Sequence, residues 1–184
     1  LYLLAGVEPG FAQNLPYLPP ELISACQSKL PDQLPGPTKT GQFRKLPAGD
    51  GFVWIAEAKK APEKGNLLAF RMNFDGSLAE NEVAFVAIRA RSVRPSVDQN
   101  PDPRPGRIRI HVAERENLWQ TALYHLAKVG RNWGWYYHPF RAAKSIAPDA
   151  GVVRLSFDLQ NQAIEIEEVR LYLTPNGFDM ARLP

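Results

Sequence analysis

The sequence predicts an all-β protein, a β-sandwich of the jelly-roll type with a proline-rich N-terminal extension that contains one short helix. The 184-residue chain carries 17 prolines and 13 glycines. Helix-period stretches are few, and short runs of β-branched and aromatic residues are many. About nine such runs, with a bend late in the last one, are typical of a jelly roll. The length allows one domain with a sizeable core and an appendage.

Residues 1–40 differ from the rest because prolines keep most of the segment extended. One short helix is expected over residues 20–30, since Pro20 suits a first helical position and Pro31 would end the helix. We expect this arm to lie against the sandwich, or to link it to an upstream domain. The apolar start, residues 1–7, is either the remnant of a secretory segment or an extension that packs on the domain.

The chain from residue 40 onwards consists of strand candidates separated by turn-forming clusters. The segment 119–126 fits either a strand or a loop that leads into one. The other candidates are 42–46, 52–58, 66–74, 83–93, 107–114, 131–140, 152–159 and 164–173.

Two of these candidates carry specific information. The segment 83–93 is apolar on both faces over most of its length, which predicts a central strand of a two-layer fold. In 164–173 the apolar residues change from even to odd positions across Glu167 and Glu168. That change of parity predicts a β-bulge or a bend between sheets.

The segment 131–140 is aromatic on both faces. One face carries Trp133, Trp135 and Tyr137. The opposite face carries Tyr136 and His138, because side chains alternate along a strand. Pro139 cannot donate a ladder hydrogen bond, so it predicts a strand end or a sheet edge. The rings either form part of the core or leave one or two members exposed as a flat platform for a ligand.

Composition restricts the partners. The net charge is +3, from 22 Lys and Arg and 19 Asp and Glu that are interspersed along the chain. This mixture favours a solvated surface over a phosphate-tracking stripe, so no nucleic acid is expected. Cys26 is the only cysteine, which excludes an intramolecular disulfide and a cysteine-ligated zinc site. No apolar run approaches the roughly 18–20 residues that span a bilayer, so no membrane partner is expected.

Signs of catalysis are few. The chain has no Gly-x-Ser-x-Gly elbow, no phosphate-cradling glycine loop and no His-Glu-x-x-His motif. Glu165 and Glu167 have strand spacing and could pair as acid and base, although a solvated strand face explains them better. Glu167 and Glu168 are candidate oxygen ligands for calcium, with a solvated turn as the alternative. Three strand candidates each carry a histidine that could ligate a metal: His111, His125 and His138.

Aromatic residues are the strongest functional signal. Flat rings bind the C–H faces of sugars, and planar donors and acceptors such as Arg89 bind the hydroxyls. Stacking on nucleic-acid bases would use the same rings, but the sequence lacks a basic run beside them. The aromatic candidates are Trp54, Trp119, Tyr124, Trp133, Trp135 and Tyr137.

Four segments resemble carbohydrate-binding modules of the family 4, 9 and 22 type. The central strand NEVAFVAIRAR (81–91) is similar to their "gly-asp-val, apolar run, arg-ala-arg" strand. WYYHPF (135–140) is similar to their "Trp, two or three residues, Pro-Phe" strand. VRLSFDL (153–159) with QAIEIEEVRL (162–171) resembles their closing pair, and DMARLP (179–184) resembles the junction to a family 10 glycoside-hydrolase-like barrel. The order and spacing of these segments cover about residues 50–175.

The resemblance implies a galactose-binding-like jelly roll, often with a structural calcium, appended to a polysaccharide-degrading enzyme. Glu167 and Glu168 stand where calcium-associated modules often have Asp-Asp. In this family pattern Trp135 is a packing residue. The resemblance therefore favours other aromatic residues as sugar ligands: Trp133, Trp119, Trp54 and Tyr124. Tyr137 and Arg89 are further candidates.

The resulting hypothesis is a non-catalytic module, secreted or periplasmic, that binds a plant or algal polysaccharide and targets an attached glycoside hydrolase. Residues 1–40 would be an arm or linker, 41–175 the sandwich, and 176–184 a linker to a downstream domain. One alternative is a structural domain that packs on its catalytic domain or a partner without binding sugar. Another is a lyase or hydrolase with its own carboxylate or histidine site. Burial of Trp54, Trp119 and Trp133 together would favour the packing domain.

Overall fold

A computed structural model describes residues 18–28, 37–39, 41–49, 51–58, 68–93, 105–157 and 160–183, with only the backbone of 23–28. Within these residues the chain forms ten strands and one 3-10 turn, η1 (Met180–Arg182). The strands are β1 (Ile23–Ser28), β2 (Gly41–Ala48), β3 (Gly51–Ala58), β4 (Ala69–Phe74), β5 (Val83–Val93), β6 (Gly106–Glu114), β7 (Thr121–Val129), β8 (Gly134–Arg141), β9 (Gly151–Ser156) and β10 (Gln162–Leu173).

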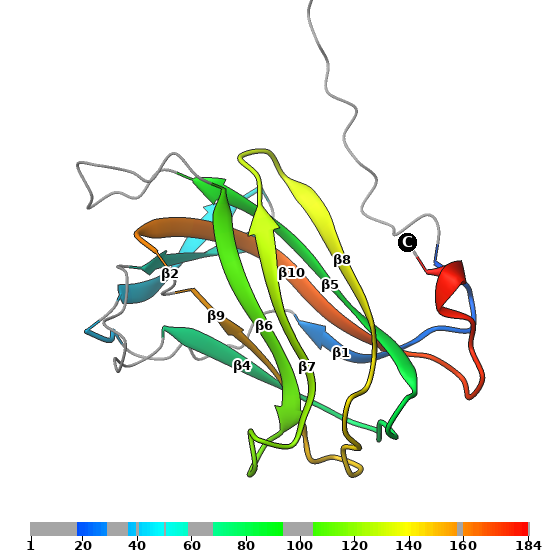
Figure 1. The fold of residues 1–184 in the computed structure, drawn as a ribbon. Helices are drawn as coiled ribbons and strands as arrows, with labels where there is room; N and C mark the ends of the chain where they lie inside the picture. Colours follow the sequence, from blue (N-terminus) through cyan, green and yellow to red (C-terminus); the bar gives the residue numbers. More distant parts are fainter. Residues whose placement is uncertain are drawn as a thin grey trace, which may run out of the picture.

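The strands form two antiparallel sheets, which confirms the predicted β-sandwich (Figure 1). The six-stranded sheet has the order β2-β3-β10-β5-β8, and β1 pairs with β10 beside it. The four-stranded sheet has the order β4-β9-β6-β7. No helix in the described part of the chain is long and apolar enough to cross a membrane.

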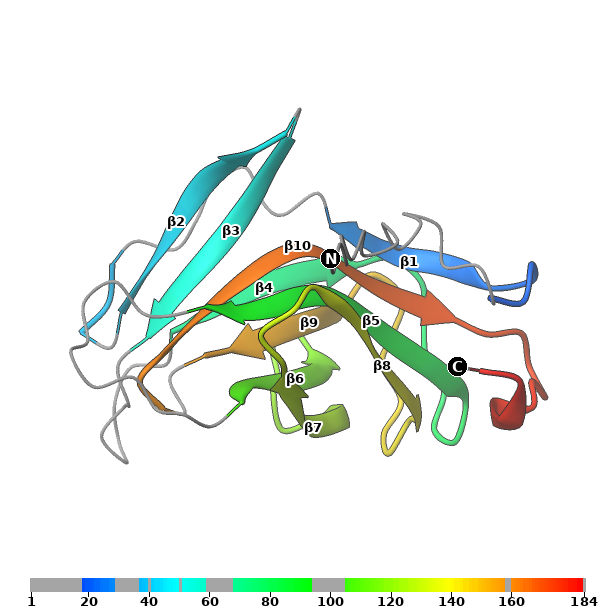
Figure 2. The ribbon, with the colours of Figure 1, turned by 90° about the horizontal axis from the view of Figure 1, so that it is seen from above.

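Strand β10 organises the six-stranded sheet. One edge of β10 pairs with β5 along most of its length, and the register shifts between Ile166 and Glu168. This shift is the β-bulge that the change of parity predicts. The other edge pairs with β3 before the bulge and with β1 after it. Figure 2 shows the β2–β3 hairpin and β1 lying along different parts of β10.

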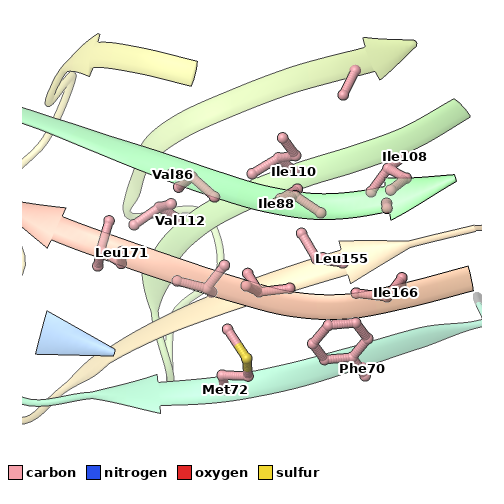
Figure 3. Close-up of a cluster of buried hydrophobic side chains, with 14 of the residues drawn as sticks. Phe70, Met72, Val86, Ile88, Ile108, Ile110, Val112, Leu155, Ile166 and Leu171 are labelled. Carbon is pink, nitrogen blue, oxygen red and sulfur yellow. The ribbon is translucent and has the colours of Figure 1, made fainter. Parts of the chain in front are cut away.

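The core lies between the sheets and is built from the apolar alternate positions of each strand (Figure 3). Strand β5 contributes Val86 and Ile88 to it, and β6 contributes Ile108 and Ile110. Residues 83–88 are buried on both faces of β5, which confirms the predicted central strand. Strand β8 pairs only with β5 among the described strands, so Pro139 lies in an edge strand as expected.

The helix expected over residues 20–30 is wrong. Residues 23–28 form β1, which pairs with β10 from Leu173 to Val169. A helix of this length is marginal in water, whereas a strand here satisfies backbone hydrogen bonds along the open edge of β10. The ambiguous segment around 119–126 is a strand, β7. The expected ends of the strands at 66 and 159 lie outside the described residues.

Candidate functional site

Aromatic rings cluster on the outer face of the six-stranded sheet, turned away from the core. Phe85 stacks on Tyr172, with ring centroids 4.7 Å apart and planes at 11°. Trp135 stacks on Tyr137 at 6.2 Å and 13°, and Tyr137 lies 6.4 Å from Phe85. Strand alternation in β5, β8 and β10 places these side chains on one face. We call Phe85, Trp135, Tyr137 and Tyr172 the outer aromatic cluster.

The two ends of the described chain pack on this cluster. Leu18 and Leu22, which precede β1, and Leu183, which follows η1, contact it. An ion pair of 2.5 Å between Arg182 and Glu21 joins these two segments. Burial, and to a smaller extent neighbouring Tyr172, raises the pKa of Tyr137. The cluster therefore serves partly as a small second core.

Charged residues occupy the rest of the same face, and each arginine there has a glutamate beside it. We call this region the paired face. The carboxylate of Glu57 is 2.7 Å from Arg44, and that of Glu165 is 2.5 Å from Arg91. The remaining pairs are Arg89 with Glu167 and Arg170 with Glu168.

Trp133 lies at the junction of the paired face with the aromatic cluster. Its ring is half-buried, and the guanidinium carbons of Arg91 and Arg89 lie 4.9 Å and 6.0 Å from its centroid. The indole N–H of neighbouring Trp135 is buried and has no hydrogen-bond partner among the described residues. A flat ring flanked by planar donors and an unsatisfied N–H is suited to bind a sugar ring and its hydroxyls.

The predicted ligand residues divide between three places. Trp133, Arg89 and Tyr137 come together on the outer face of the six-stranded sheet. Trp54 is only 5% exposed and belongs to the core, so its ring offers no ligand surface. Trp119 is 94% exposed in the turn between β6 and β7, and Tyr124 is 64% exposed on the other sheet. The structure therefore assembles one site from three of the six candidates.

Two residues of the site were absent from the sequence-based candidates. Phe85 and Tyr172 form the closest stacked pair of the cluster. Phe85 gives no signal in the sequence because β5 is buried on both faces over residues 83–88, so its outer side is not indicated. In β10 the charged residues Glu168 and Arg170 alternate with core residues. The β-bulge at Glu167 changes which positions of β10 face outward, so after it the even-numbered Tyr172 lies on the outer face. The change of parity in the sequence could therefore have identified Tyr172.

The three histidines do not meet at one point. The rings of His125 and His138 lie 4.5 Å apart, between strands β7 and β8. Burial, followed by the nearby His125, lowers the pKa of His138 to about 4. His111 is on the outer face of the four-stranded sheet, where Nε2 is 2.8 Å from Thr121 Oγ1. The described residues contain no group of three or more His, Cys, Asp and Glu side chains placed to hold a metal ion.

The residues expected to bind calcium do not fit that ion. Glu167 and Glu168 lie on the paired face, beside Arg89 and Arg170. Calcium requires six to eight oxygen ligands. Here each carboxylate already has an arginine partner, and the described residues bring no group of three or more His, Cys, Asp and Glu side chains together to hold a metal ion.

Comparisons with known proteins find similarity of fold. No protein-family model and no curated protein matches the sequence. An apo-form cyclase from Fischerella sp. matches with a TM-score of 0.54 and 13% identity, over 89% of this chain and 93% of that chain. A CBM4 structure matches with a TM-score of 0.51 and 10% identity, over 73% and 90%. The apo structure of BiXyn10A CBM1 matches with a TM-score of 0.48 and 13% identity, over 82% and 94%.

The match to the CBM4 structure agrees with the order of motifs in the sequence. The predicted jelly-roll sandwich and the resemblance to family 4, 9 and 22 type modules are confirmed at the level of the fold. A cyclase has a similar architecture, so the fold alone does not assign a function. The chain thus has the β-sandwich fold found in carbohydrate-binding modules.

Proposed function

We propose that this chain is a non-catalytic module that binds polysaccharide on the outer face of the six-stranded sheet, centred on Trp133. The observation that carries the proposal is the half-buried Trp133 ring beside Arg89 and Arg91, next to the unpartnered indole N–H of Trp135. The ring would contact the C–H face of a sugar, and the donors would bind its hydroxyls. The similarity of fold to carbohydrate-binding modules supports the proposal.

The arginines suit a neutral glycan because glutamates already balance their charges. Each guanidinium offers donors in addition to the one directed at its glutamate. Attachment to a glycoside hydrolase, in a secreted or periplasmic protein, would give the module its role. Tethering converts a second encounter with the substrate into an intramolecular one, so millimolar affinity is sufficient.

Tryptophan fluorescence tests the proposal. The chain is titrated with soluble xylan, β-glucan, mannan, laminarin and alginate. We expect saturable quenching or a blue shift with one of them, abolished by Trp133→Ala and retained by Trp119→Ala. The matched control is Trp119, which is exposed in a turn away from the site. Loss of the signal in Trp119→Ala and not in Trp133→Ala would contradict the assignment.

The second candidate is a domain that packs on its catalytic domain or a partner without binding sugar. It is favoured by the contacts of Leu18, Leu22 and Leu183, which show that the outer aromatic cluster accepts apolar chain segments. Burial of all three tryptophans would have favoured it further, but Trp119 is exposed and Trp133 is only half-buried. A flat response to every glycan, with an unchanged melting temperature, would support this candidate.

A further inference from the structure

The outer face of the four-stranded sheet is basic. Alternation places Ile108, Ile110 and Val112 in the core, so the remaining positions of β6 point outward. The same argument in β4, β9 and β7 gives a set of outward residues that includes no Asp or Glu. The acidic residue of these strands, Glu114, ends β6 at an alternate position shared with Ile108, Ile110 and Val112, not in the outward set. We call its charged members the basic face: Arg71, Arg154, Arg107, Arg109 and Lys128.

The register of the sheet brings these cations close together. One row across the strands runs Arg71, Arg154, His111 and Tyr124. Arg109 lies in the next row beside Ser156 and Leu126. Neighbouring strands are about 4.8 Å apart, so the first row spans roughly 14 Å.

Four of these cations lack a counter-ion within the described residues. Arg71, Arg107, Arg109 and Lys128 take part in none of the ion pairs there, whereas arginines of the paired face each have a glutamate. These four positive charges lie on one face of the molecule, where they would attract anions.

Tyr124 provides a flat apolar surface at the edge of this face. Its ring is 64% exposed. The guanidinium carbon of Arg109 lies 5.8 Å from the ring centroid, and the His111 ring meets it edge-on at 5.9 Å. These two neighbours hold the ring in place beside the cations.

The geometry points to a second binding surface, distinct from the Trp133 site, for a linear anionic polysaccharide that carries carboxylates or sulfate esters. Tyr124 binds a sugar face, and Arg71, Arg107, Arg109 and Lys128 bind the anionic groups of successive sugars. Single-stranded nucleic acid fits less well, because it needs several stacking rings along the groove and this face supplies only one. Duplex grooves need a helix or a two-stranded ribbon that enters them, whereas this face is the surface of a four-stranded sheet.

Isothermal titration tests this surface with oligomers of equal length: oligo-alginate, a sulfated galactan oligomer, neutral laminari-oligosaccharide and single-stranded DNA. We expect binding of one or both anionic glycans at moderate salt, weakening as salt rises. The neutral oligomer should not bind at this face. The first two arms distinguish a carboxylate from a sulfate ester as the recognised group. DNA that binds as tightly as either anionic glycan would overturn the proposal.

Matched variants locate the surface. Arg109→Gln combined with Lys128→Gln should weaken binding about tenfold, which corresponds to roughly 1.4 kcal/mol. Arg131→Gln combined with Lys144→Gln removes the same charges from exposed loops and should change affinity less than about twofold. Equal losses in both double variants would show non-specific attraction to net charge and overturn the proposal.

Two further measurements separate a sugar site from simple ion exchange. Tyr124→Ala should weaken binding of the anionic glycan, whereas binding to a simple ion-exchange surface would not change.

His111 provides a reporter, because burial and the charges of Arg154 and Arg109 lower its pKa. A bound anion offsets those charges, so the pKa of His111 measured by NMR should rise. Trp133→Ala should leave this binding intact, which keeps the test independent of the Trp133 site.

Discussion

The outer faces of the two sheets are both rich in arginine but differ in how its charge is balanced. On the six-stranded sheet Arg44, Arg89, Arg91 and Arg170 each lie beside a glutamate. On the four-stranded sheet the outward positions contain no acidic residue. One face is therefore close to neutral, and the other retains a positive field.

This difference shows that arginine serves two purposes in one small fold. On the paired face the ion pairs fix the orientation of guanidinium groups and neutralise them, which leaves hydrogen-bond donors beside Trp133. On the basic face Arg71, Arg107 and Arg109 take part in no ion pair among the described residues, so their charge would be available to an external anion. This contrast predicts opposite effects on the free energy of unfolding. Removing a charge from the paired face should destabilise the fold, whereas removing charges from the basic face should not.

The largest effect is expected from Glu165→Gln on the paired face. The Glu165 side chain is only 11% exposed and lies 2.5 Å from Arg91. The substitution leaves a partly buried guanidinium without its counter-ion, at a cost of roughly 1–3 kcal/mol. For a chain of this length each kcal/mol lowers the melting temperature by about 2–4 °C. Thermal unfolding followed by circular dichroism measures it.

Glu116→Gln is the control for that experiment, since Glu116 is exposed in a turn. It should alter the free energy of unfolding by less than about 0.5 kcal/mol. Equal stability of the two variants would mean that the ion pairs of the paired face contribute nothing measurable. The two faces would then not differ in how their charges contribute to stability.

The next effect concerns the line where β7 of one sheet meets β8 of the other. Burial and His125 lower the pKa of His138 from 6.5 to about 4. The unfolded chain therefore binds a proton below pH 6.5 that the folded chain does not bind until about pH 4. Stability should fall as the pH drops through this window, by on the order of 1–2 kcal/mol once partial solvent screening is allowed for.

Unfolding of the parent chain and of His138→Phe at a series of pH values isolates this contribution. The variant keeps an aromatic ring at the position but cannot titrate. We expect the difference between the two melting temperatures to change between pH 6.5 and pH 4 and to be constant above. Parallel curves throughout would show that His138 has the same pKa in the folded and the unfolded chain, and would contradict the prediction.

The contrast between the faces was only partly predictable from the sequence. Periodicity is local, so it predicts the strands after residue 40 and the bulge near Glu167, which the structure confirms, but it does not predict β1. The identity of each strand's neighbour is not local. The partners Arg89 and Glu167 come from β5 and β10, and only their adjacency in the sheet brings them together. Strand adjacency also brings the cations of the basic face together. In the sequence these cations are interspersed with acidic residues, which indicates only a mixed surface.

Trp54 and residues 23–28 differ from the sequence-based predictions for similar reasons. Trp54 lies in a strand whose residues 53–58 are all buried, so no alternation indicates that its ring faces the core. For residues 20–30, Pro20 and Pro31 suggest the two ends of a helix, yet pairing with β10 makes residues 23–28 a strand. In both cases tertiary context outweighs the local pattern.

A smaller effect of opposite sign is expected on the basic face. Arg109→Gln combined with Lys128→Gln removes two charges that have like-charged neighbours and no described counter-ion. The free energy of unfolding should stay constant or rise by up to about 0.5 kcal/mol. Added salt should stabilise the parent chain more than the variant, because it screens the repulsion that the variant lacks. Melting temperatures over a salt series measure both quantities.

His111 gives an independent check on that experiment. Because Arg109 is one of the charges that lower its pKa, the pKa of His111 should rise in the variant. A fall in melting temperature as large as that of Glu165→Gln would contradict the contrast. It would show that Arg109 or Lys128 makes a stabilising contact comparable with those of the paired face.

The smallest effect, close to zero, is expected from calcium. A bound calcium ion stabilises the folded state in proportion to the logarithm of its concentration over the dissociation constant. Glu167 and Glu168 are engaged by Arg89 and Arg170, so the ion would have to displace an arginine from a carboxylate and leave that arginine unpaired. Millimolar calcium, compared with chelator, should therefore shift the melting temperature by less than about 1 °C. In Arg89→Gln a carboxylate is released, and a calcium-dependent rise in that variant alone would show that the pairing itself excludes the cation. A calcium-dependent rise of several degrees in the melting temperature of the parent chain would instead mean that the arginines do not neutralise the glutamates of the paired face. That result would contradict the contrast between the two sheets.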